Sequence, residues 1–252
     1  MLSRQRKHLI LERLRRDGQV VAKHVSQELG LSEDTIRKDL RELAQEGRLQ
    51  RVHGGALPSS PAMADYAGRQ QLATAGKIAI GRTAARMVQT GQVVLLDGGT
   101  TALQVAHHLP PDLRATVVTH SPTIAVALVP HPTIEVVLIG GRLFKHSIVA
   151  VGAATIEALG HIRADVYFMG VTGIHAEAGL STGDLEEAHV KRALMRSAAD
   201  TILLASAEKL NAASPFVIAP VTEVSGLIVE QDTPDSAIAP YETLGLTITR
   251  AK

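Results

Sequence analysis

Apolar side chains recur at helical spacing in three short segments of residues 1–47, and glycines separate the segments. We expect helices over about Arg4–Arg16 and Val21–Leu29, ending at Gly18 and Gly30, because glycine readily adopts the left-handed conformation that follows a helix. Only a short turn separates the second helix from a third, as helix-turn-helix geometry requires. The pattern therefore predicts a compact three-helix unit.

The third helix has two chemically different faces. Ser32 is a favourable N-cap residue, and Leu31 and Ile36 have the spacing of a hydrophobic staple. Ile36, Leu40 and Leu43 then form an apolar stripe. Such a helix suits the major groove of DNA, although a solvated surface helix has the same pattern. The polar and cationic side chains away from the stripe are Thr35, Arg37, Lys38 and Arg41.

A short strand and a Gly-Gly turn are expected in residues 47–56, directly after the third helix. Arg48, Arg51 and His53 accompany this turn, as in a wing that contacts the DNA backbone. The alternative is a basic loop that leads into a segment of prolines and small residues. We therefore expect a DNA-binding domain over residues 1–57, a linker over 58–76 and a second domain over 77–252.

From residue 77 onward, apolar runs alternate with helical patterns. The alternation predicts an α/β domain with a mostly parallel sheet covered on both faces. We expect helices over Lys77–Val88, Ala102–His108, Ser121–Val129, Ala153–Leu159 and Glu186–Ala199. We expect strands over Val93–Leu96, Thr116–Thr119, Ile134–Ile139, Val166–Met169, Ile202–Ala205, Leu227–Val229 and Leu246–Ile248.

A run of glycines and polar residues joins the first strand of this domain to the next helix. The run is Asp97-Gly98-Gly99-Thr100-Thr101. Glycines let the backbone approach a ligand closely, threonines add hydroxyl groups, and a helix start offers free N–H groups, so this segment can cradle a phosphate. Asp97 can accept a hydrogen bond from a ligand hydroxyl. A tight strand-to-helix turn with a threonine cap is the alternative interpretation.

Polar groups also follow other predicted strands, whose carboxyl ends meet at one edge of a parallel sheet. Thr119-His120 follows the second strand, Gly140-Gly141 the third and Lys209 the fifth. Lys209 either offers a cation to a phosphate or is an ordinary surface lysine. Glu187 and Lys191 have the i, i+4 spacing of a helix salt bridge, which suits a binding pair equally well.

Several longer segments together carry a resemblance to a known family. They include Leu31–Leu40 and Arg51–Ala56 in the N-terminal unit, and Asp97–Thr101, Asp165–Gly170 and Glu186–Arg192 in the second domain. In this order, over nearly the whole chain, they resemble the DeoR family of bacterial regulators. The resemblance implies a winged helix-turn-helix followed by a sensor domain, whose fold is similar to that of ribose-5-phosphate isomerases and glucosamine-6-phosphate deaminases.

The resemblance also implies ligands. It implies that the sensor domain binds an effector, commonly a phosphorylated sugar or polyol. The effector's phosphate would lie at Gly99-Thr100-Thr101, and Lys209 would belong to the same pocket. The family's DNA contacts would fall on Thr35, Arg37, Lys38 and Arg41.

Three positions depart from the family's pattern. Lys38 stands where arginine is usual, which keeps the charge but loses the bidentate guanidinium. His120 stands where asparagine is usual, and Ser206 where aspartate is usual. We expect both of these residues to line the pocket. The ligand class therefore stays open, with an unphosphorylated or unusual effector as the alternative.

Charge is distributed unevenly along the chain. Residues 1–55 contain 12 Lys/Arg and 8 Asp/Glu, a net charge of +4, whereas the remaining residues carry −3. A basic N-terminal domain suggests a polyanionic partner. The chain has no cysteine, no run of about 18 apolar residues and no signal-peptide pattern. We therefore expect a cytoplasmic protein without a membrane span, metal site or cofactor.

Three functions fit these patterns. The first is a repressor that binds double-stranded operator DNA as a homodimer or homotetramer and responds to a small effector. The second is a sugar-phosphate isomerase or deaminase with an accessory DNA-binding domain. The third is an architectural DNA-binding protein with a vestigial second domain. We expect the first and not an enzyme, because no pair of residues is fixed by spacing as an acid/base couple.

Overall fold

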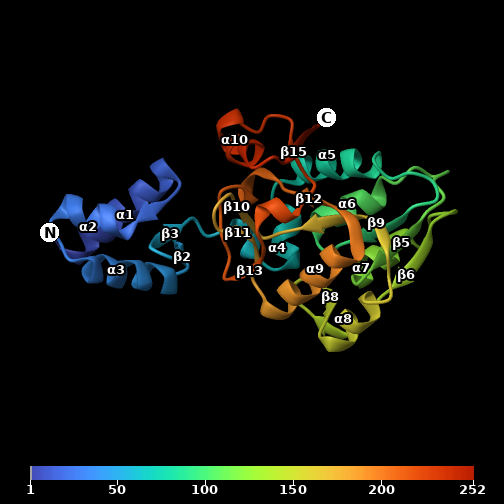
Figure 1. The fold of residues 1–252 in the computed structure, drawn as a ribbon, viewed down its shortest axis with the longest axis horizontal. Coiled ribbons are helices and arrows are strands. Elements are labelled where there is room, and N and C mark those ends of the chain that lie inside the picture. The colour runs from blue at the N-terminus through green and yellow to red at the C-terminus, as the bar shows by residue number, and fades with distance from the viewer. Residues whose placement is uncertain (1) are drawn as a thin grey trace.

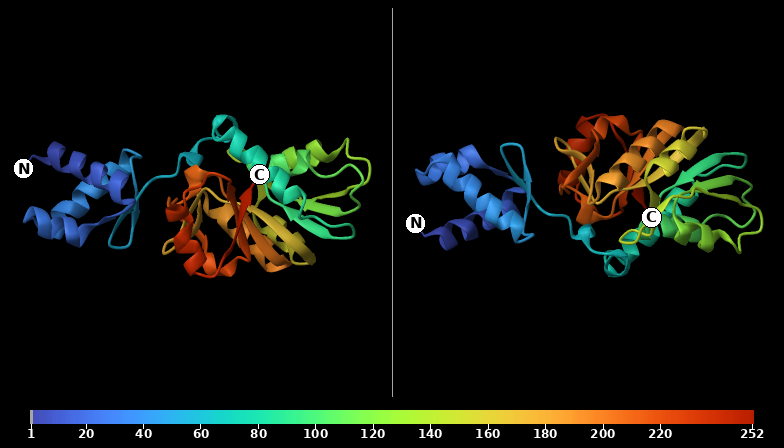
Figure 2. Two further views of the ribbon diagram at one scale, coloured as in Figure 1. Left: turned by 90° about the horizontal axis from the view of Figure 1, so that it is seen from above. Right: turned by 90° about the horizontal axis from the view of Figure 1, so that it is seen from below.

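The computed structural model describes residues 2–252. A small N-terminal part, residues 2–57, is joined by an extended segment to a larger part; we call the two parts the head and the body (Figure 1). Figure 2 shows the same separation from two further directions. Among the helices of residues 2–252, none combines the length and apolar character needed to cross a bilayer.

The head packs three helices against a three-stranded antiparallel sheet with the strand order β1-β3-β2. Its core contains Ile10, Val25, Ile36 and Leu43, all fully buried. The three-helix unit predicted from the sequence is therefore confirmed. Its elements are α1 (Ser3–Asp17), β1 (Val20–Val21), α2 (Ala22–Leu29), α3 (Glu33–Gln45), β2 (Gln50–Val52) and β3 (Gly55–Leu57).

The start of the second helix differs from the expectation. Val21 was expected in the helix, but Val20 and Val21 form β1 and pair with β3. A two-residue strand is too short to leave an alternating pattern in the sequence. Gly55 in β3 is required by this pairing, because a Cβ at that position would overlap the carbonyl of Val20.

Residues 58–76, which the sequence predicts to be a linker, contain η1 (Pro61–Met63), α4 (Tyr66–Gln71) and the start of α5 (Thr74–Ala85). Contacts with the body fix the segment: the Pro58 carbonyl accepts the Ala213 N–H at 3.2 Å, and the Tyr66 N–H donates to the carbonyl of His146 at 3.1 Å. The helix α4 has no counterpart among the elements predicted from the sequence, because it is too short to show a helical period and is stabilised by tertiary contacts.

The body is built on a seven-stranded, entirely parallel sheet with the order β15-β14-β12-β9-β4-β5-β6. All seven expected strands occur in it. The prediction of a mostly parallel α/β sheet is therefore confirmed. The strands are β4 (Val93–Leu96), β5 (Thr116–Thr119), β6 (Glu135–Leu138), β9 (Ala164–Gly170), β12 (Ala198–Leu204), β14 (Gly226–Glu230) and β15 (Thr247–Ala251).

Helices cover both faces of this sheet (Figure 2). Val94 and Leu96 of β4 point to the face packed by α5, α6 and α7, whereas Leu95 points to the face packed by α8, α9 and α10. The expected helix over 186–199 ends at Ser197, because Ala198 already pairs with Ala164 of β9. The remaining helices are α6 (Thr100–His107), α7 (Pro122–Leu128), α8 (Ala153–Leu159), α9 (Leu185–Ser197) and α10 (Asp235–Thr243).

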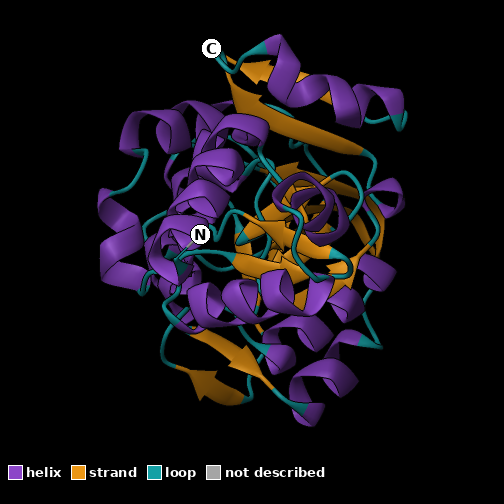
Figure 3. Cartoon of the chain, turned by 90° about the vertical axis from the view of Figure 1, so that its left-hand side faces the viewer, coloured by secondary structure: helices purple, strands orange, loops and turns teal. Residues whose placement is uncertain are grey.

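Several short elements of the body have no counterpart among the elements expected from the sequence. Two of the strand groups are small antiparallel sheets, with the orders β10-β11-β13 and β7-β8. Seen from the side of the head, as in Figure 3, helices and short strands lie in front of the larger sheet. These elements are β7 (Arg142–Phe144), β8 (Val149–Val151), β10 (Gly173–His175), β11 (Gly179–Thr182), η2 (Ala207–Lys209), β13 (Phe216–Ala219) and η3 (Val221–Glu223).

Candidate functional site

The exposed side of α3 presents a compact set of cations. The Oγ of Ser32 accepts the N–H of Thr35 at 3.3 Å, so the helix begins where the sequence predicted. The apolar stripe of α3 is buried in the head, whereas Arg37, Lys38 and Arg41 are exposed. We call these three residues the α3 cationic face. The prediction of a two-faced helix is confirmed.

Acidic neighbours hold one of these cations. The guanidinium of Arg37 pairs with Glu33 at 2.7 Å and approaches Asp34 at 3.8 Å. All three side chains are exposed, so water screens the pairs and they contribute little to stability. Arg37 can therefore exchange these partners for a phosphate or a base edge at small cost.

A buried ion pair anchors α3 to α1. Asp39 is only 1% exposed, and both of its carboxylate oxygens accept hydrogen bonds from Arg6, at 2.5 and 2.9 Å. The bond to Asp39 raises the pKa of Arg6, so the guanidinium stays charged. Sequence reasoning missed this pair. The signal was the position of Asp39 three residues after Ile36, on the buried stripe.

The wing residues predicted from the sequence lie apart from the α3 cationic face. Arg51 is exposed on β2, and the turn to β3 passes through His53 and Gly54, where Gly54 has a φ of +75°. His53 borders a cavity shared with His175 of β10. Arg48 borders a groove on the α1 side of the head. Of these three side chains, His53 is the one that borders a residue of the body, and the DNA contacts of all three stay predictions.

A second candidate site lies in the body, where β4, β9 and β12 end. We call it the strand-end pocket. Of the residues predicted to bind an effector, Gly98, Gly99, Thr100, Thr101, Glu187, Lys191 and Lys209 line it. The lining residues that sequence reasoning did not select are Ala62, Arg69, Lys77, Ala102, Ser147, Gly170, Val171, Thr172 and Glu208. Among residues 2–252, no cluster of three or more histidine, aspartate or glutamate side chains is arranged to hold a metal.

The turn from β4 into α6 forms one wall of the pocket. Gly99 has a φ of +99°, and α6 begins at Thr100, so the first N–H groups of the helix have no helical partner. A side chain at Gly98 would overlap Val149, which accounts for the glycine there. This wall therefore offers backbone donors and the hydroxyls of Thr100 and Thr101 to an anion.

Three cations of the pocket lack an acidic partner. Lys77, Lys209 and Arg69 are all largely withdrawn from solvent. Their polar atoms reach only neutral groups: Lys77 donates to the carbonyl of Arg69 at 2.5 Å, and the Nζ of Lys209 lies 3.4 Å from the Oγ1 of Thr101. None of the three lies within 4.0 Å of a carboxylate of residues 2–252.

Burial of these cations lowers their pKa values. Desolvation lowers the pKa of Lys209 to about 8, and it also lowers the pKa of Lys77 and of Arg69. Burial thus destabilises the charged forms, and an anion in the pocket would stabilise them. An excess of buried positive charge beside a helix start is the pattern of a phosphate site.

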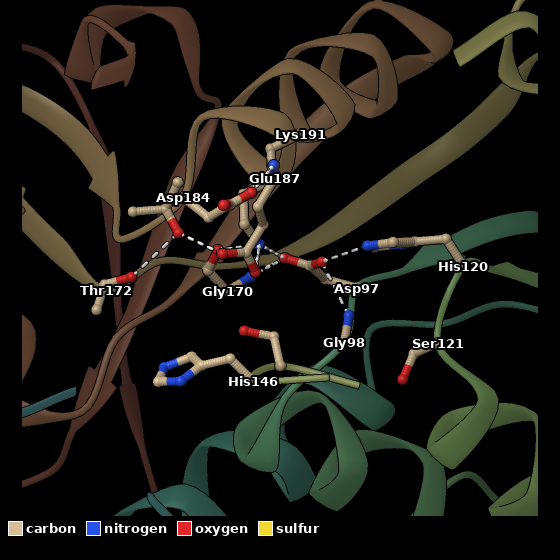
Figure 4. Close-up of polar contacts among 12 residues, drawn as sticks. Asp97, Gly98, His120, Ser121, His146, Gly170, Thr172, Asp184, Glu187 and Lys191 are labelled. Carbon is tan, nitrogen blue, oxygen red and sulfur yellow. Dashed lines mark hydrogen bonds and ion pairs between the residues drawn. The ribbon is translucent and has the colours of Figure 1, made fainter. Parts of the chain in front are cut away.

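Asp97 is part of the pocket's foundation and not of its lining (Figure 4). It is fully buried, pairs with Lys191 at 2.5 Å, and accepts the N–H groups of Gly98 and Gly170, each at 2.8 Å. Burial alone would raise the pKa of Asp97, but the charge of Lys191 and the other contacts outweigh it and lower the pKa. The expected role of accepting a ligand hydroxyl does not fit a carboxylate so fully engaged.

His120 and Thr119 lie behind this carboxylate. Both are fully buried, and the Nε2 of His120 is 3.6 Å from the Oδ1 of Asp97 (Figure 4). Burial lowers the pKa of His120, so the imidazole is neutral near pH 7. The Oγ1 of Thr119 accepts the Ser121 N–H at 3.1 Å. Neither Thr119 nor His120 is among the residues that line the strand-end pocket, so direct contact of either with an effector stays a prediction.

Gly140 and Gly141 also serve packing and not the pocket lining. The carbonyl of Gly140 accepts the Thr155 hydroxyl at 2.9 Å, and a Cβ at Gly141 would overlap the same hydroxyl. Ser206, another expected lining residue, is buried and donates to Glu208 at 2.7 Å. Glu208, its partner, is the residue that reaches the pocket.

Glu187 and Lys191 fit both interpretations of their spacing. They approach each other at 3.8 Å, and both line the pocket. Glu187 also accepts the hydroxyl of Thr182 at 2.5 Å, so its orientation is fixed. The two side chains therefore form a salt bridge, and both also border the pocket where a ligand would bind.

Two family signatures match the chain. The DeoR-like helix-turn-helix domain matches residues 6–61, and the DeoR C terminal sensor domain matches residues 72–231. The first range covers the head, and the second contains most of the strand-end pocket.

Relatives match over nearly their whole lengths. HTH-type transcriptional regulator GlpR of Haloferax volcanii is 33% identical over 251 residues, covering 98% of each chain. HTH-type transcriptional repressor GlcR of Bacillus subtilis is 33% identical over 233 residues, covering 92% of this chain and 90% of the relative. The glycerol-3-phosphate regulon repressor of Escherichia coli is 28% identical over 239 residues, covering 94% and 95%.

Solved structures resemble this chain more loosely. Ribose 5-phosphate isomerase A of Methanocaldococcus jannaschii superposes with a TM-score of 0.40 and 16% identity over 53% of this chain and 52% of that chain. The full-length sorbitol operon regulator SorC of Klebsiella pneumoniae gives a TM-score of 0.37 and 14% identity, over 83% and 91% of the two chains. Superpositions this loose say nothing about function.

Proposed function

The chain belongs to the DeoR family of transcriptional regulators, and from this premise we propose that it is a repressor controlled by a phosphorylated sugar or polyol. The head would bind double-stranded operator DNA of sugar or polyol metabolism genes, and the effector would bind in the strand-end pocket. An effector that prefers one conformation shifts the protein toward it, and this linkage would release the operator.

The observation that carries the effector proposal is a group of three cations, two buried and one partly buried, that have no acidic partner among residues 2–252. Arg69, Lys77 and Lys209 surround a space that is also bordered by the start of α6. A phosphate would accept hydrogen bonds from these donors and neutralise their charge. Sugar and polyol monophosphates carry such a group, which supports this class over a neutral metabolite.

The DNA proposal is supported by the α3 cationic face. Arg37, Lys38 and Arg41 are exposed on a helix whose opposite side is locked into the core of the head. A fixed helix with exposed cations can enter a major groove and read base edges. Arg48, Arg51 and His53 would add contacts if the wing reaches the DNA backbone.

We also propose the setting in which this regulator works. Helix-turn-helix proteins commonly bind paired half-sites as dimers, so we expect a homodimer or homotetramer. A cytoplasmic location follows from access to operator DNA. We propose that the strand-end pocket binds its ligand without catalysis, because no histidine is among the residues that line it.

The proposal is tested by measuring the binding of the full-length protein to fluorescent DNA from upstream of its own gene. We expect specific binding that weakens steeply with salt, because phosphate contacts release counterions. Sugar and polyol monophosphates would then be added one at a time, and at least one should lower DNA affinity. Equal affinity for upstream and unrelated DNA would refute the DNA proposal.

A further inference from the structure

Glu208 lines the strand-end pocket and has one carboxylate oxygen without a hydrogen-bond partner among residues 2–252. Its Oε1 accepts the hydroxyl of Ser206 at 2.7 Å, which fixes the orientation of the carboxylate. Its Oε2 is buried and has no hydrogen-bond partner within residues 2–252. Glu208 lines the pocket together with Lys77 and Lys209. A buried oxygen that accepts nothing is costly, so the structure calls for a donor at this place.

The neighbouring cations do not supply that donor. The negative charge of Glu208 raises the pKa of both Lys77 and Lys209, against the larger effect of their burial. Neither ammonium group, however, lies within 4.0 Å of the carboxylate, because Lys77 donates to a backbone carbonyl and Lys209 to Thr101 and Leu204. The charges act on one another across a space that a ligand can occupy.

The second carboxylate of the pocket is engaged differently. Glu187 accepts the hydroxyl of Thr182 at 2.5 Å, and its other oxygen lies 3.8 Å from the ammonium of Lys191. Each of its oxygens thus has a protein group beside it. Of these two carboxylates, Glu208 is the one with an oxygen left for a ligand.

Resting on the proposed function, we propose that Glu208 is the specificity-determining residue of the pocket and accepts a hydrogen bond from a hydroxyl group of the phosphorylated ligand. The cations and the start of α6 hold the phosphate, and Glu208 selects for a carbon skeleton that carries a free hydroxyl. The same carboxylate repels a second phosphate or a carboxylate group on the ligand. The ligand class is therefore a hydroxylated monophosphate, and bisphosphates and phosphorylated acids are excluded.

The test measures ligand affinity by calorimetry on the full-length protein. The probes are inorganic phosphate, propyl phosphate without a hydroxyl, and four hydroxylated monophosphates: glycerol 3-phosphate, glucose 6-phosphate, fructose 1-phosphate and sorbitol 6-phosphate. Wild-type protein should bind at least one hydroxylated monophosphate about 10-fold or more tightly than propyl phosphate. Fructose 1,6-bisphosphate should bind less tightly than that best monophosphate.

The variants are Glu208→Ala and Glu208→Gln, with Glu223→Ala as a matched control because Glu223 is exposed and lies outside the pocket. Glu208→Ala should weaken the best hydroxylated monophosphate by about 10- to 100-fold, the range for a hydrogen bond to a charged group. Affinity for inorganic phosphate should stay the same or increase, because a nearby negative charge is removed. Glu208→Gln should lose less, since its amide oxygen still accepts a hydrogen bond.

Two failures are distinguishable. If wild-type protein binds a hydroxylated monophosphate and both Glu208 variants bind it with the wild-type affinity, the specificity role of Glu208 is overturned and the proposed function stands. An equal loss of affinity for inorganic phosphate and for the hydroxylated ligand would also overturn it, because the residue would then only support the lysines. If wild-type protein binds none of the phosphates, the effector proposal fails and Glu208 loses its role with it. Unchanged DNA binding in each variant confirms folding.

Discussion

The two candidate sites are both cationic, yet they hold their charges in opposite ways. Arg37, Lys38 and Arg41 stand on the surface of the head, where water screens them. Lys77 and Lys209 are 3% and 6% exposed, and burial lowers their pKa values. The exposed set suits a long polyanion that many weak contacts recognise, and the buried set suits one small anion that replaces lost hydration.

The largest expected effect on stability concerns Asp97, the buried carboxylate that pairs with Lys191. Asp97→Ala removes the closer carboxylate partner of the buried Lys191 and leaves its ammonium only the more distant Glu187, at 3.8 Å. The free energy of unfolding should fall by about 3–5 kcal/mol, as expected when one member of a buried ion pair is removed. Urea denaturation measures this, with exposed Asp34→Ala as the control. A loss of unfolding free energy below about 1 kcal/mol would mean that the buried charge of Lys191 does not depend on Asp97.

The pH dependence of stability distinguishes the buried cations from the exposed ones. The pKa of Lys209 is lowered from 10.5 to about 8, so between pH 8 and 10.5 the unfolded chain holds a proton that the folded chain has lost. Stability contributed by this group therefore rises with pH across that window, by about 3 kcal/mol in all.

The comparison of wild-type protein with Lys209→Met isolates this contribution. The difference in unfolding free energy between the two should change across the window from pH 8 to 10.5 and stay constant below it. Phosphate affinity of the wild type should fall over the same range, because Lys209 loses its charge. If the unfolding free energies of the two proteins changed with pH in parallel, the pKa of Lys209 would not be lowered in the folded protein.

Removing one exposed cation should matter only to DNA. Arg37→Ala should weaken operator binding by about 1–3 kcal/mol and leave stability nearly unchanged, because its pairs with Glu33 and Asp34 are solvent-screened. Fluorescence anisotropy measures the affinity, and Arg86→Ala, an exposed change in the body, is the control. Equal binding by Arg37→Ala and wild type would remove α3 from the DNA interface.

The smallest effect tests the acidic partner of that cation. Glu33→Ala should cost at most about 0.5 kcal/mol of stability, as for other helix-surface pairs. DNA affinity should rise slightly, because a negative charge beside the α3 cationic face is removed. A decrease in DNA affinity would indicate that Glu33 orients Arg37 for binding.

The elements with strong periodicity could be predicted from the sequence, and those held by tertiary contacts could not. The strands Val93–Leu96 and Thr116–Thr119 are confirmed residue for residue, since fully buried parallel strands leave continuous apolar runs. The helix α4 is too short for a pattern, so its Arg69 was missed although it lines the pocket. The position of Arg69 in the sequence does not indicate that it lines the same pocket as Glu208 and Lys209 of η2.

The strand-end rule located the pocket but did not sort its residues. Asp97 and His120 do lie at strand ends, yet neither lines the pocket, and their side chains lie 3.6 Å from each other. Direction at a strand end depends on the local turn, which residue type alone does not specify. Glu208 belongs to no motif, and its residue type alone does not show that it lines the pocket. The Gly98–Thr101 turn was recognised, because glycines between a strand and a helix start commonly form an anion-binding turn.

We expect the two cationic sites to be coupled within one protein. The most direct measurement is the affinity of full-length protein for its operator with and without the monophosphate that binds tightest in the pocket, together with the affinity for that ligand with and without DNA. We expect each to lower the affinity for the other by the same factor, as linkage requires. Tight ligand binding that leaves operator affinity unchanged would contradict it.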